Sequence, residues 1–543
     1  MLLKNYARAL KKEFSGYNGK SFGKDVLAGI TVAAVALPLA LAFGVSSGAD
    51  AAAGLITAII AGLLIGALSG GSYQISGPTG AMTAILLPLV AQYKMQGVFV
   101  ACFISGIILI LCGVLRLGAL VSFIPAPVLT GFTSGIAIII ALGQIPNLTG
   151  LVSSGETTIE KLAGYFTTPQ SPNLTGIIIG AAVIVFMAVY PKKLNQYFPG
   201  SLFAIILATA ANLIFRFDVP AVGEIPRSLL LDNRLSFSQI DLAAVKNLIA
   251  PAISIAALGL IESLLCGASA GRMKNEKLDA DRELIAQGIG NMVIPFLGGV
   301  PATAAIARTS VAIKSGGQTR LTSIIHSVVL LLSMFLLAPV MSAIPLSALS
   351  GVLIMTAWRM NEWGVIKGFF SKRLKTAIAQ FLITMVATVV FDLTLAILIG
   401  IIFSIAVFVV KVSDMQVSIS DIDHKRLTDD ACDCEQLENA AVAYLTGPLY
   451  FGTVGRLEDK LHELSQKDII IISMRGVPFA DMSGVQGLSE LCTRLSLSET
   501  SVYFSCVQPN VAQMFDRCGL TENIGQERFF WSTDKVLSHI ASN

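Results

Sequence analysis

Two short segments combine small, hydroxyl and proline residues within long apolar stretches of this sequence. The first break is Ser-Gly-Pro-Thr-Gly-Ala-Met-Thr at 76–83, and the second break is Gly-Gly-Val-Pro-Ala-Thr-Ala-Ala at 298–305. Glycine and proline interrupt helices or begin them, and the first amides of a helix lack intrahelical partners. A helix that begins inside an apolar region therefore directs free N–H groups and its positive dipole end into that region. This arrangement favours an anion.

Two ionisable residues accompany the breaks. Arg308 follows the second break, and we expect it two turns into a short helix at 302–314. A charge at bilayer depth costs at least ~2.5 kcal/mol, so a cation beside a bound anion is one interpretation, and pairing with a carbonyl or Glu262 is the other. Glu262 lies in ISIAALGLIESLLCGAS. Its carboxyl group suits proton coupling or one ligand position of a sodium ion, while a salt bridge between helices is the structural alternative.

The composition indicates that lipid surrounds most of the chain. Of 543 residues, 54% are hydrophobic and 13% are charged, with mean hydropathy +0.73. Soluble domains carry roughly 25% charged residues, so the apolar excess predicts a bilayer as solvent. The formal net charge of +3 indicates no nucleic-acid partner. Residues 1–24 are polar and basic, which predicts a cytoplasmic N-terminal segment and no cleavable signal peptide.

The apolar stretches predict fourteen membrane spans in a transmembrane region at 25–412. They lie near 25–46, 52–69, 77–93, 97–118, 122–143, 174–190, 200–216, 248–270, 284–298, 302–314, 321–338, 346–359, 375–391 and 393–412. With this count, most basic loop residues lie on the side of the N-terminus. The positive-inside rule then places both termini in the cytoplasm. We expect the chain to lie in the inner (plasma) membrane.

The two halves, 25–216 and 248–412, contain seven predicted spans each. An odd number per half inverts the second half relative to the first. Each break follows a Gly-rich helix at a matching position in its half. Paired interrupted segments of this kind indicate the binding site of a transporter.

The composition changes after residue 412. Residues 413–439 are rich in charged residues and predict a linker, in which Cys432 and Cys434 form an isolated C-x-C that we interpret as solvated rather than metal-binding. Residues 440–543 alternate short strands (AVAYLTG, PLYFG, DIIIISM and SVYFSC) with helical patterns near 453–466, 483–496 and 509–519. This alternation predicts a small cytoplasmic α/β domain.

In this domain Ser483 follows a strand and opens a helix, so we expect an N-cap. The alternative is a regulatory site that is phosphorylated or binds an anion. The sequence shows no nucleophile–base set, Walker loop or metal-ligand spacing. We therefore expect neither an enzyme nor an ATP-driven pump, with no metal and no cofactor beyond a coupling ion, H⁺ or Na⁺.

Several motifs resemble the SulP (sulfate permease) family of anion transporters. They are FIPAPVLTGFTSGIA, the ISGPTG break, Ala307-Arg308-Thr309 with the glycines that follow, and DMSG at 481–484, which resembles the family's STAS domain. VALPLALAFGVSSGA and ELIAQGIGN are most similar to the cyanobacterial bicarbonate transporters of this family. The resemblance covers nearly the whole chain. It implies a seven-plus-seven inverted repeat, a core (spans 1–4 and 8–11) that moves like an elevator against a gate (5–7 and 12–14), and a homodimer.

The resemblance also implies where ligands bind. The substrate is expected between the N-termini of spans 3 and 10, at Thr79, Gly80, Ala81, Ala304, Ala305 and Arg308. Where the bicarbonate transporters hold sodium with one Asp and two Thr, this chain has Glu262, Cys266 and Ile306. Cysteine and isoleucine are poor ligands for a hard cation, so proton coupling is favoured over sodium.

We therefore predict secondary active transport of a small inorganic or organic anion, with bicarbonate, sulfate and a dicarboxylate as candidates. A nucleobase symporter on the same fold is one alternative, although it would need additional hydrogen-bonding side chains to recognise a ring. The others are a passive anion channel and an anion sensor that signals through the soluble domain.

Overall fold

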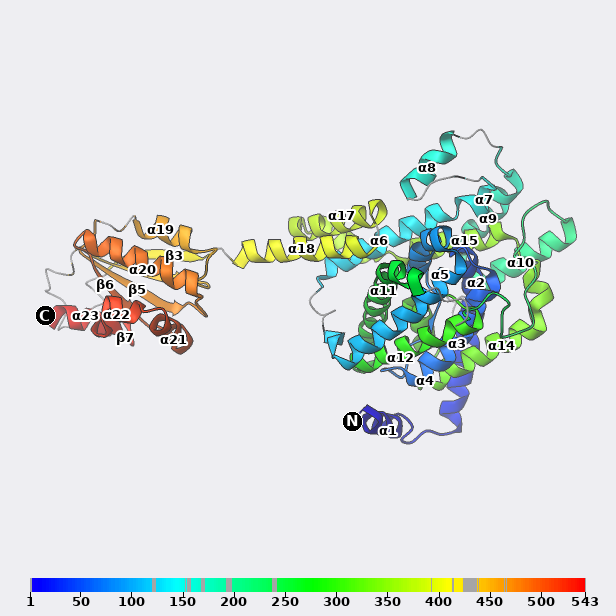
Figure 1. Ribbon diagram of the computed structural model, residues 1–543, viewed down its shortest axis with the longest axis horizontal. Helices are drawn as coiled ribbons and strands as arrows, with labels where there is room; N and C mark the ends of the chain where they lie inside the picture. The colour runs from blue at the N-terminus through cyan, green and yellow to red at the C-terminus, as the bar shows by residue number, and fades with distance from the viewer. Residues whose placement is uncertain are drawn as a thin grey trace. The chain divides into compact units, whose positions relative to one another are not determined.

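The protein forms two compact units, Met1–Ile402 and Phe403–Asn543. The computed structural model (Figure 1) describes residues 2–119, 124–151, 153, 158–167, 171–191, 198–236, 242–391, 393–412, 415–422, 437, 439–462, 464 and 466–542. The predicted linker cysteines Cys432 and Cys434 lie outside these residues.

The first unit contains a set of helices that we call the core group. It comprises α2 (Gly19–Ser46), α3 (Ala51–Ile60) with a π-helical turn (Ala61–Ile65) and α4 (Gly66–Leu68), α5 (Gly80–Val114), α11 (Leu242–Lys274), α12 (Ala280–Val293) with a 3-10 turn (Ile294–Leu297), α13 (Ile306–Lys314) and α14 (Leu321–Ser342). Helix α2 packs on α3 and α14, and α5 packs on α11 and α12. The N-terminal α1 (Leu2–Glu13) precedes this group.

A second set, the gate group, packs around α6 and α15. It comprises α6 (Ala126–Gly143), α7 (Ile145–Thr149), α9 (Leu174–Val189), α10 (Gly200–Phe215), α15 (Leu346–Met360) and α17 (Lys375–Val390). Two shorter helices, α8 (Thr158–Thr167) and α16 (Trp363–Ser371), connect its members. Helix α17 packs on α6, and α15 packs on α9. These partners are the ones that the core and gate division of the spans predicts.

Each predicted span contains a helix or part of one, although the spans at 77–93 and 302–314 begin in the two breaks, ahead of α5 and α13. The spans at 77–93 and 97–118 are the two parts of α5, which breaks where Lys94 adopts a positive φ of 57°. Within the described residues, seven helices are long and apolar enough to cross a membrane, and four shorter apolar helices accompany them. The chain is thus a helical membrane protein, while the count of fourteen crossings stays a prediction.

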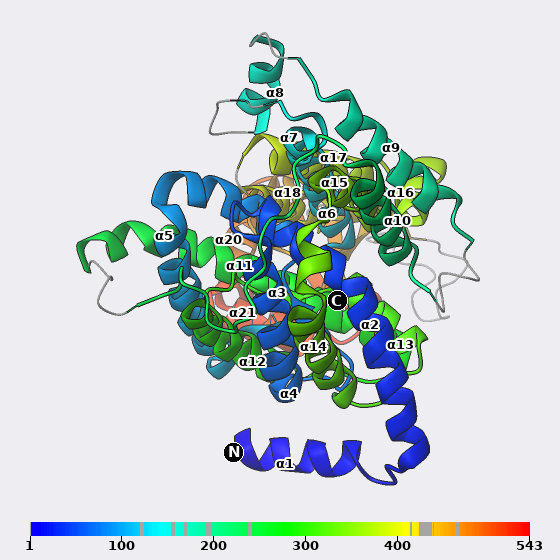
Figure 2. The same ribbon diagram turned by 90° about the vertical axis from the view of Figure 1, so that its right-hand side faces the viewer.

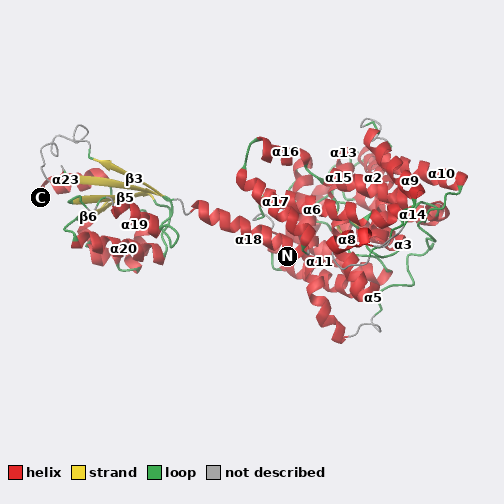
Figure 3. Ribbon diagram, turned by 90° about the horizontal axis from the view of Figure 1, so that it is seen from above, coloured by secondary structure: helices red, strands yellow, loops and turns green. Residues whose placement is uncertain are grey.

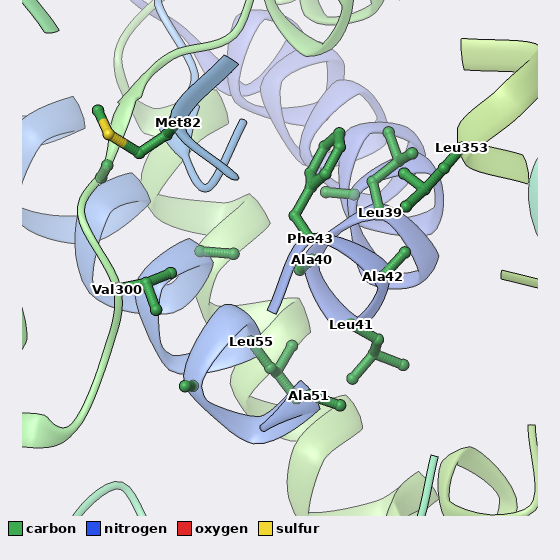
Figure 4. Close-up of a cluster of buried hydrophobic side chains, with 14 of the residues drawn as sticks. Leu39, Ala40, Leu41, Ala42, Phe43, Ala51, Leu55, Met82, Val300 and Leu353 are labelled. Carbon is green, nitrogen blue, oxygen red and sulfur yellow. The ribbon is translucent and has the colours of Figure 1, made fainter. Parts of the chain in front are cut away.

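The core group is built from small side chains that let its helices approach closely. A Cβ atom at Gly54 of α3 would collide with the backbone carbonyl of Ala40 in α2. Phe43 and Leu55 from this contact pack in the same buried cluster as Met82 and Val300 (Figure 4). Met82 lies in the first turn of α5, and Val300 lies in the second break. The tight α2–α3 packing therefore supports both breaks.

The second unit holds a five-stranded sheet covered by helices (Figure 3). The strands follow the order β3 (Gln416–Asp421), β4 (Ala440–Thr446), β5 (Ile469–Gly476), β6 (Ser501–Ser505) and β7 (Phe529–Phe530). The helices are α19 (Val454–His462), α20 (Met482–Leu497), α21 (Pro509–Arg517), α22 (Leu520–Ile524) and α23 (Thr533–Ser542). Strand β3 is antiparallel to β4, and the remaining neighbours are parallel.

Two expectations for this unit are wrong. Residues 416–421 belong to the sheet rather than to the linker, because each of them pairs with a residue of β4. The PLYFG segment is not a strand: it forms a turn with a single bridge between Leu449 and Ala480. Short apolar runs of this kind do not distinguish a strand from a buried turn. Helices α19, α20 and α21 confirm the three predicted helical patterns.

Candidate functional site

The two breaks lie side by side and pair through their backbones. Residues Ser76–Gly77 form β1 and Thr303–Ala304 form β2, and these short strands are antiparallel, with Ser76 opposite Ala304. The amide of Ala305 also donates to the carbonyl of Ile75 at 2.9 Å. The structure therefore brings together two segments that lie more than two hundred residues apart in the sequence.

Polar side chains from the surrounding core group hold the second break. Asn291 of α12 donates to the carbonyl of Ala302 (2.9 Å) and accepts from its amide (2.8 Å). The hydroxyl of Thr57 accepts from the amide of Val300 at 2.7 Å. Buried backbone groups away from water need such partners, so these side chains fix the irregular chain before α13 begins.

The non-helical part of the first break ends at Thr79, which caps α5. Its hydroxyl accepts from the amide of Met82 at 3.4 Å. Among the described residues, the amides of Gly80 and Ala81 have no hydrogen-bond acceptor. The hydroxyl of Thr83 donates back to the carbonyl of Gly80 (2.7 Å) and is not a free donor. The N-terminus of α5 thus presents two backbone donors beside a threonine cap.

The second break differs from the expectation at Ala304 and Ala305. The amide of Ala304 donates to the hydroxyl of Ser263 (3.2 Å), and that of Ala305 donates to Ile75. An N–H group has one proton to donate, so neither amide is free in this conformation. In α13, as the structure describes it, the amides of the first turn, at 306–308, have no acceptor.

Arg308 lies in the first turn of α13, not two turns into it, because the helix begins at Ile306. Its side chain is 1% exposed, and its Nη2 atom donates to the carbonyl of Pro78 in the first break. The Nη1 atom is buried and has no hydrogen-bond partner among the described residues. A Cβ atom at Gly77 would collide with Nη1. The carbonyl pairing is therefore present, and one nitrogen of the guanidinium remains for another acceptor.

Glu262 of α11 meets a hydroxyl group from each break. Its Oε2 atom accepts from Thr79 at 2.9 Å and from Thr303 at 2.6 Å. The two hydroxyl oxygens are themselves 3.1 Å apart. No ion pair between Glu262 and Arg308 occurs among the described residues. Glu262 is half-buried, and its carboxylate joins α11 to both breaks through uncharged partners.

Cys266 and Ile306 do not join this group of oxygens. The Cys266 thiol is buried and donates to the Thr309 hydroxyl at 3.4 Å, and Ile306 is 41% exposed. The sequence argument against sodium, which rested on lost hydroxyl groups at these two positions, is therefore incomplete. Thr79 and Thr303 supply two hydroxyl groups beside Glu262 from elsewhere in the chain.

The sequence did not indicate Glu283 of α12, a fully buried carboxylate close to the first break. It is 0% exposed and accepts from the hydroxyl of Ser69 (2.5 Å), the amide of Gly70 (2.9 Å) and the amide side chain of Gln287 (2.9 Å). Gln287 also donates to Ser76 in the first break at 2.9 Å. The acid precedes the predicted span at 284–298 by one residue, where a solvated helix start is the ordinary expectation.

Ser483 does not cap α20. The N-cap is Asp481, whose carboxylate accepts from the amide of Gly484 at 2.7 Å. Ser483 lies exposed in the first turn. Asp and Ser are equally good caps, so the DMSG sequence alone does not distinguish between them. The regulatory role of Ser483 stays a prediction.

Comparisons with known proteins agree with this architecture. The sulfate permease family model matches residues 22–387, and the STAS domain model matches residues 431–536. The chain is 33% identical to the putative sulfate transporter YvdB of Bacillus subtilis, over 96% of this chain and 98% of that protein. It is 26% identical to the bicarbonate transporter BicA of Picosynechococcus sp., over 95% and 94% of the two chains.

Among solved structures, the fold matches murine Slc26a9, an anion transporter in an inward-facing state. The TM-score is 0.82 at 16% identity, covering 96% of this chain and 91% of the other. At that identity the likeness shows the fold alone. Together with the paired breaks and the C-terminal α/β unit, these matches show that the chain belongs to the sulfate permease family of anion transporters and carries a STAS domain.

Proposed function

We propose that this protein is a secondary active transporter that binds a small anion between the N-termini of α5 and α13. The observation that carries the proposal is Arg308, whose guanidinium is buried with its Nη1 atom unpartnered among the described residues. An uncompensated buried charge is costly, and a bound anion supplies the missing countercharge and acceptor.

Backbone donors support the same position. The free amides of Gly80 and Ala81 belong to one helix end, and those of Ile306 and Ala307 belong to the other. Two helix N-termini and a guanidinium together favour an oxyanion with several acceptor oxygens. Bicarbonate, sulfate and a dicarboxylate all meet this description, and relatives named for sulfate and bicarbonate support this substrate class.

We assign Glu262 to proton coupling. Three oxygens, from Glu262, Thr79 and Thr303, lie within 2.6–3.1 Å of one another. Each hydroxyl donates one proton, so the two threonines account for two of the three contacts. A proton on Oε2 lets Glu262 donate to one threonine, which is then free to donate to the other, so that all three contacts are hydrogen bonds. Loss of that proton leaves the Thr79–Thr303 contact without its hydrogen bond and loosens the junction between the breaks.

Movement of the core group against the gate group completes the proposed cycle. Gly80 of the first break contacts Ile140 of gate helix α6 so closely that a Cβ atom would collide with the Ile140 side chain. The break therefore lies against the surface along which an elevator movement would occur. We further propose a homodimer in the plasma membrane with both termini in the cytoplasm, as the loop charges predict.

Uptake into proteoliposomes under separate proton and sodium gradients tests this function. We expect a proton gradient to drive accumulation of labelled sulfate or bicarbonate without sodium. Glu262→Gln should retain exchange between internal and external anion but lose accumulation, and Glu224→Gln, at an exposed loop carboxylate, should behave like the native chain. Gradient-driven accumulation by Glu262→Gln would refute the coupling role. Accumulation driven by sodium alone would assign the oxygens of Glu262, Thr79 and Thr303 to that ion.

A further inference from the structure

The N-terminal helix α1 lies at a steep angle to α2 and to one side of its first turn, as Figures 1 and 2 both show. A short turn at residues 14–18 separates the two helices. The sequence predicts only a polar segment here. In the structure α1 is amphipathic, and one of its faces contacts the ends of the core-group helices.

Tyr6 provides the first of these contacts. Its hydroxyl donates to the carbonyl of Ala67 in α4 at 2.8 Å. The guanidinium carbons of Arg282 and Arg320 lie 4.2 and 5.6 Å from the centre of its ring. Cation–π contacts of this kind attach the helix to α12 and to the start of α14.

Glu13, seven residues further along the same face, provides the second contact. Its carboxylate accepts from the amide (2.8 Å), Nε (2.9 Å) and Nη2 (2.7 Å) of Arg320. The side chains of this ion pair are only 9% and 6% exposed. A buried ion pair with three hydrogen bonds holds its partners in one orientation, so Tyr6 and Glu13 together determine which face of α1 turns away from the protein.

The face that turns away is basic. Arg8, Lys11 and Lys12 lie at helical spacings opposite Tyr6 and Glu13, and all three are exposed. None of them forms an ion pair with another residue in the part of the chain that the structure describes. Three cations therefore project from a helix whose other face is anchored.

The lipid-facing surface of α2 begins close to α1. Phe22, Leu27 and Ile30 are 51%, 63% and 47% exposed, although they belong to an apolar helix of a membrane protein. Exposed apolar residues on such a helix mark the hydrocarbon region. Lys20 and Lys24, both exposed, lie beside Phe22 in the sequence and mark the level of the headgroups. Helix α1 joins α2 at this end through the turn at residues 14–18.

We propose that the basic face of α1 (Arg8, Lys11 and Lys12) binds the anionic headgroups of the adjoining leaflet. An amphipathic helix at the interface with cations on its outer face has the chemistry for phosphate-bearing lipids. Because Tyr6 and Glu13 attach α1 to α4, α12 and α14, headgroup binding also fixes these helix ends at the membrane surface. This inference does not depend on the transported anion.

Hydrogen exchange of the α1 amides in the full-length protein tests the proposal. The protein is placed in nanodiscs of phosphatidylcholine alone or of phosphatidylcholine and phosphatidylglycerol in equal amounts. We expect exchange to be slower by about tenfold with phosphatidylglycerol, since each basic residue near an anionic surface contributes to binding. Added salt should reduce the difference. Soluble glycerol phosphate, added to the phosphatidylcholine discs, should not reproduce it.

Two triple variants make the test specific. Arg8→Gln/Lys11→Gln/Lys12→Gln should exchange at the same rate in both lipids. Arg475→Gln/Arg517→Gln/Lys535→Gln removes the same charge from exposed positions of the STAS unit and should keep the difference. Equal exchange of the native chain in both lipids, or a lipid difference that survives in the α1 variant, would overturn the proposal.

Tyr6→Leu separates lipid binding from docking. It should raise α1 exchange in phosphatidylcholine alone, because the cation–π contacts and the hydroxyl bond are lost. Unchanged exchange in that lipid would show that Tyr6 does not hold α1 on the core group, and would remove the proposed link to the helix ends.

Discussion

The two breaks look alike in sequence but make different contributions to the site. In the first break Thr79 caps α5, and the Pro78 carbonyl accepts from Arg308. In the second break Ala305 provides no side-chain cap for α13, and Arg308 adds a full charge. The second break is therefore the more positive of the two, while the first supplies a hydroxyl and an acceptor. The two breaks share a similar sequence pattern, whereas single side chains give them different chemical roles.

Removing the charge of the second break should have the largest effect. Arg308→Gln loses a buried charged donor, so we expect anion affinity to fall by about 100-fold. Isothermal titration of the purified protein with sulfate and bicarbonate measures this affinity. Arg359→Gln is a matched control, since Arg359 also donates to a backbone carbonyl, that of Met187, but lies in the gate group. Equal losses in both variants would contradict the assignment.

Removing the side chain that holds the second break should have the next largest effect, on the stability of the protein. Asn291→Leu leaves the buried amide and carbonyl of Ala302 unpaired, at a cost of about 2–3 kcal/mol in the free energy of unfolding. Gln287→Leu removes the hydrogen bonds to Ser76 and to Glu283, and it should cost less because Glu283 keeps two other donors and no backbone group loses this partner. The melting temperatures of both variants in detergent make the comparison. A larger loss in Gln287→Leu would reverse the ranking of the two breaks.

Filling the space at the first break should displace the guanidinium without removing it. The added methyl group of Gly77→Ala would collide with Arg308 Nη1. We expect about tenfold weaker anion binding with little change in melting temperature. At Gly259 of α11 a Cβ atom would meet only ordinary contacts from 3.5 Å outward, so Gly259→Ala should bind normally. Native affinity in Gly77→Ala would separate Arg308 from the anion site.

The smallest difference concerns the two threonines that contact Glu262. Thr79→Val loses this hydrogen bond and the α5 cap, whereas Thr303→Val loses only the hydrogen bond. Thr79→Val should therefore be less stable than Thr303→Val by about 1 kcal/mol, and Thr79→Ser should restore most of the loss. Equal melting temperatures for the two valine variants would show that the cap contributes nothing.

Much of the architecture was predictable from the sequence. Apolar length, loop charges and Gly/Pro interruptions located the helices and both breaks, because these features follow from local chemistry and from lipid as solvent. The motifs likewise identified the family and the STAS unit. Strand β3 was missed although Met415, Val417 and Ile419 alternate with polar residues, because this alternation is short and lies in a stretch rich in charged residues.

Side-chain partners were not predictable. The sequence placed Glu262, Thr79 and Thr303 on three separate segments, and only folding shows that their oxygens meet. It likewise indicated that Arg308 is functional, but not that the residue pairs with Pro78 and fits against Gly77. Nor did it show that the amides of Ala304 and Ala305 are already bonded within the protein.

Composition and motif spacing already show that the chain enters a membrane, where its helices break, and which residues carry charge into the apolar region. Which amides stay free, which hydroxyls reach the carboxylate and how the N-terminal helix is oriented follow only from the folded chain. Membrane insertion and helix breaks depend on residues adjacent in the chain, whereas hydrogen-bond pairing depends on atoms brought together across more than two hundred residues.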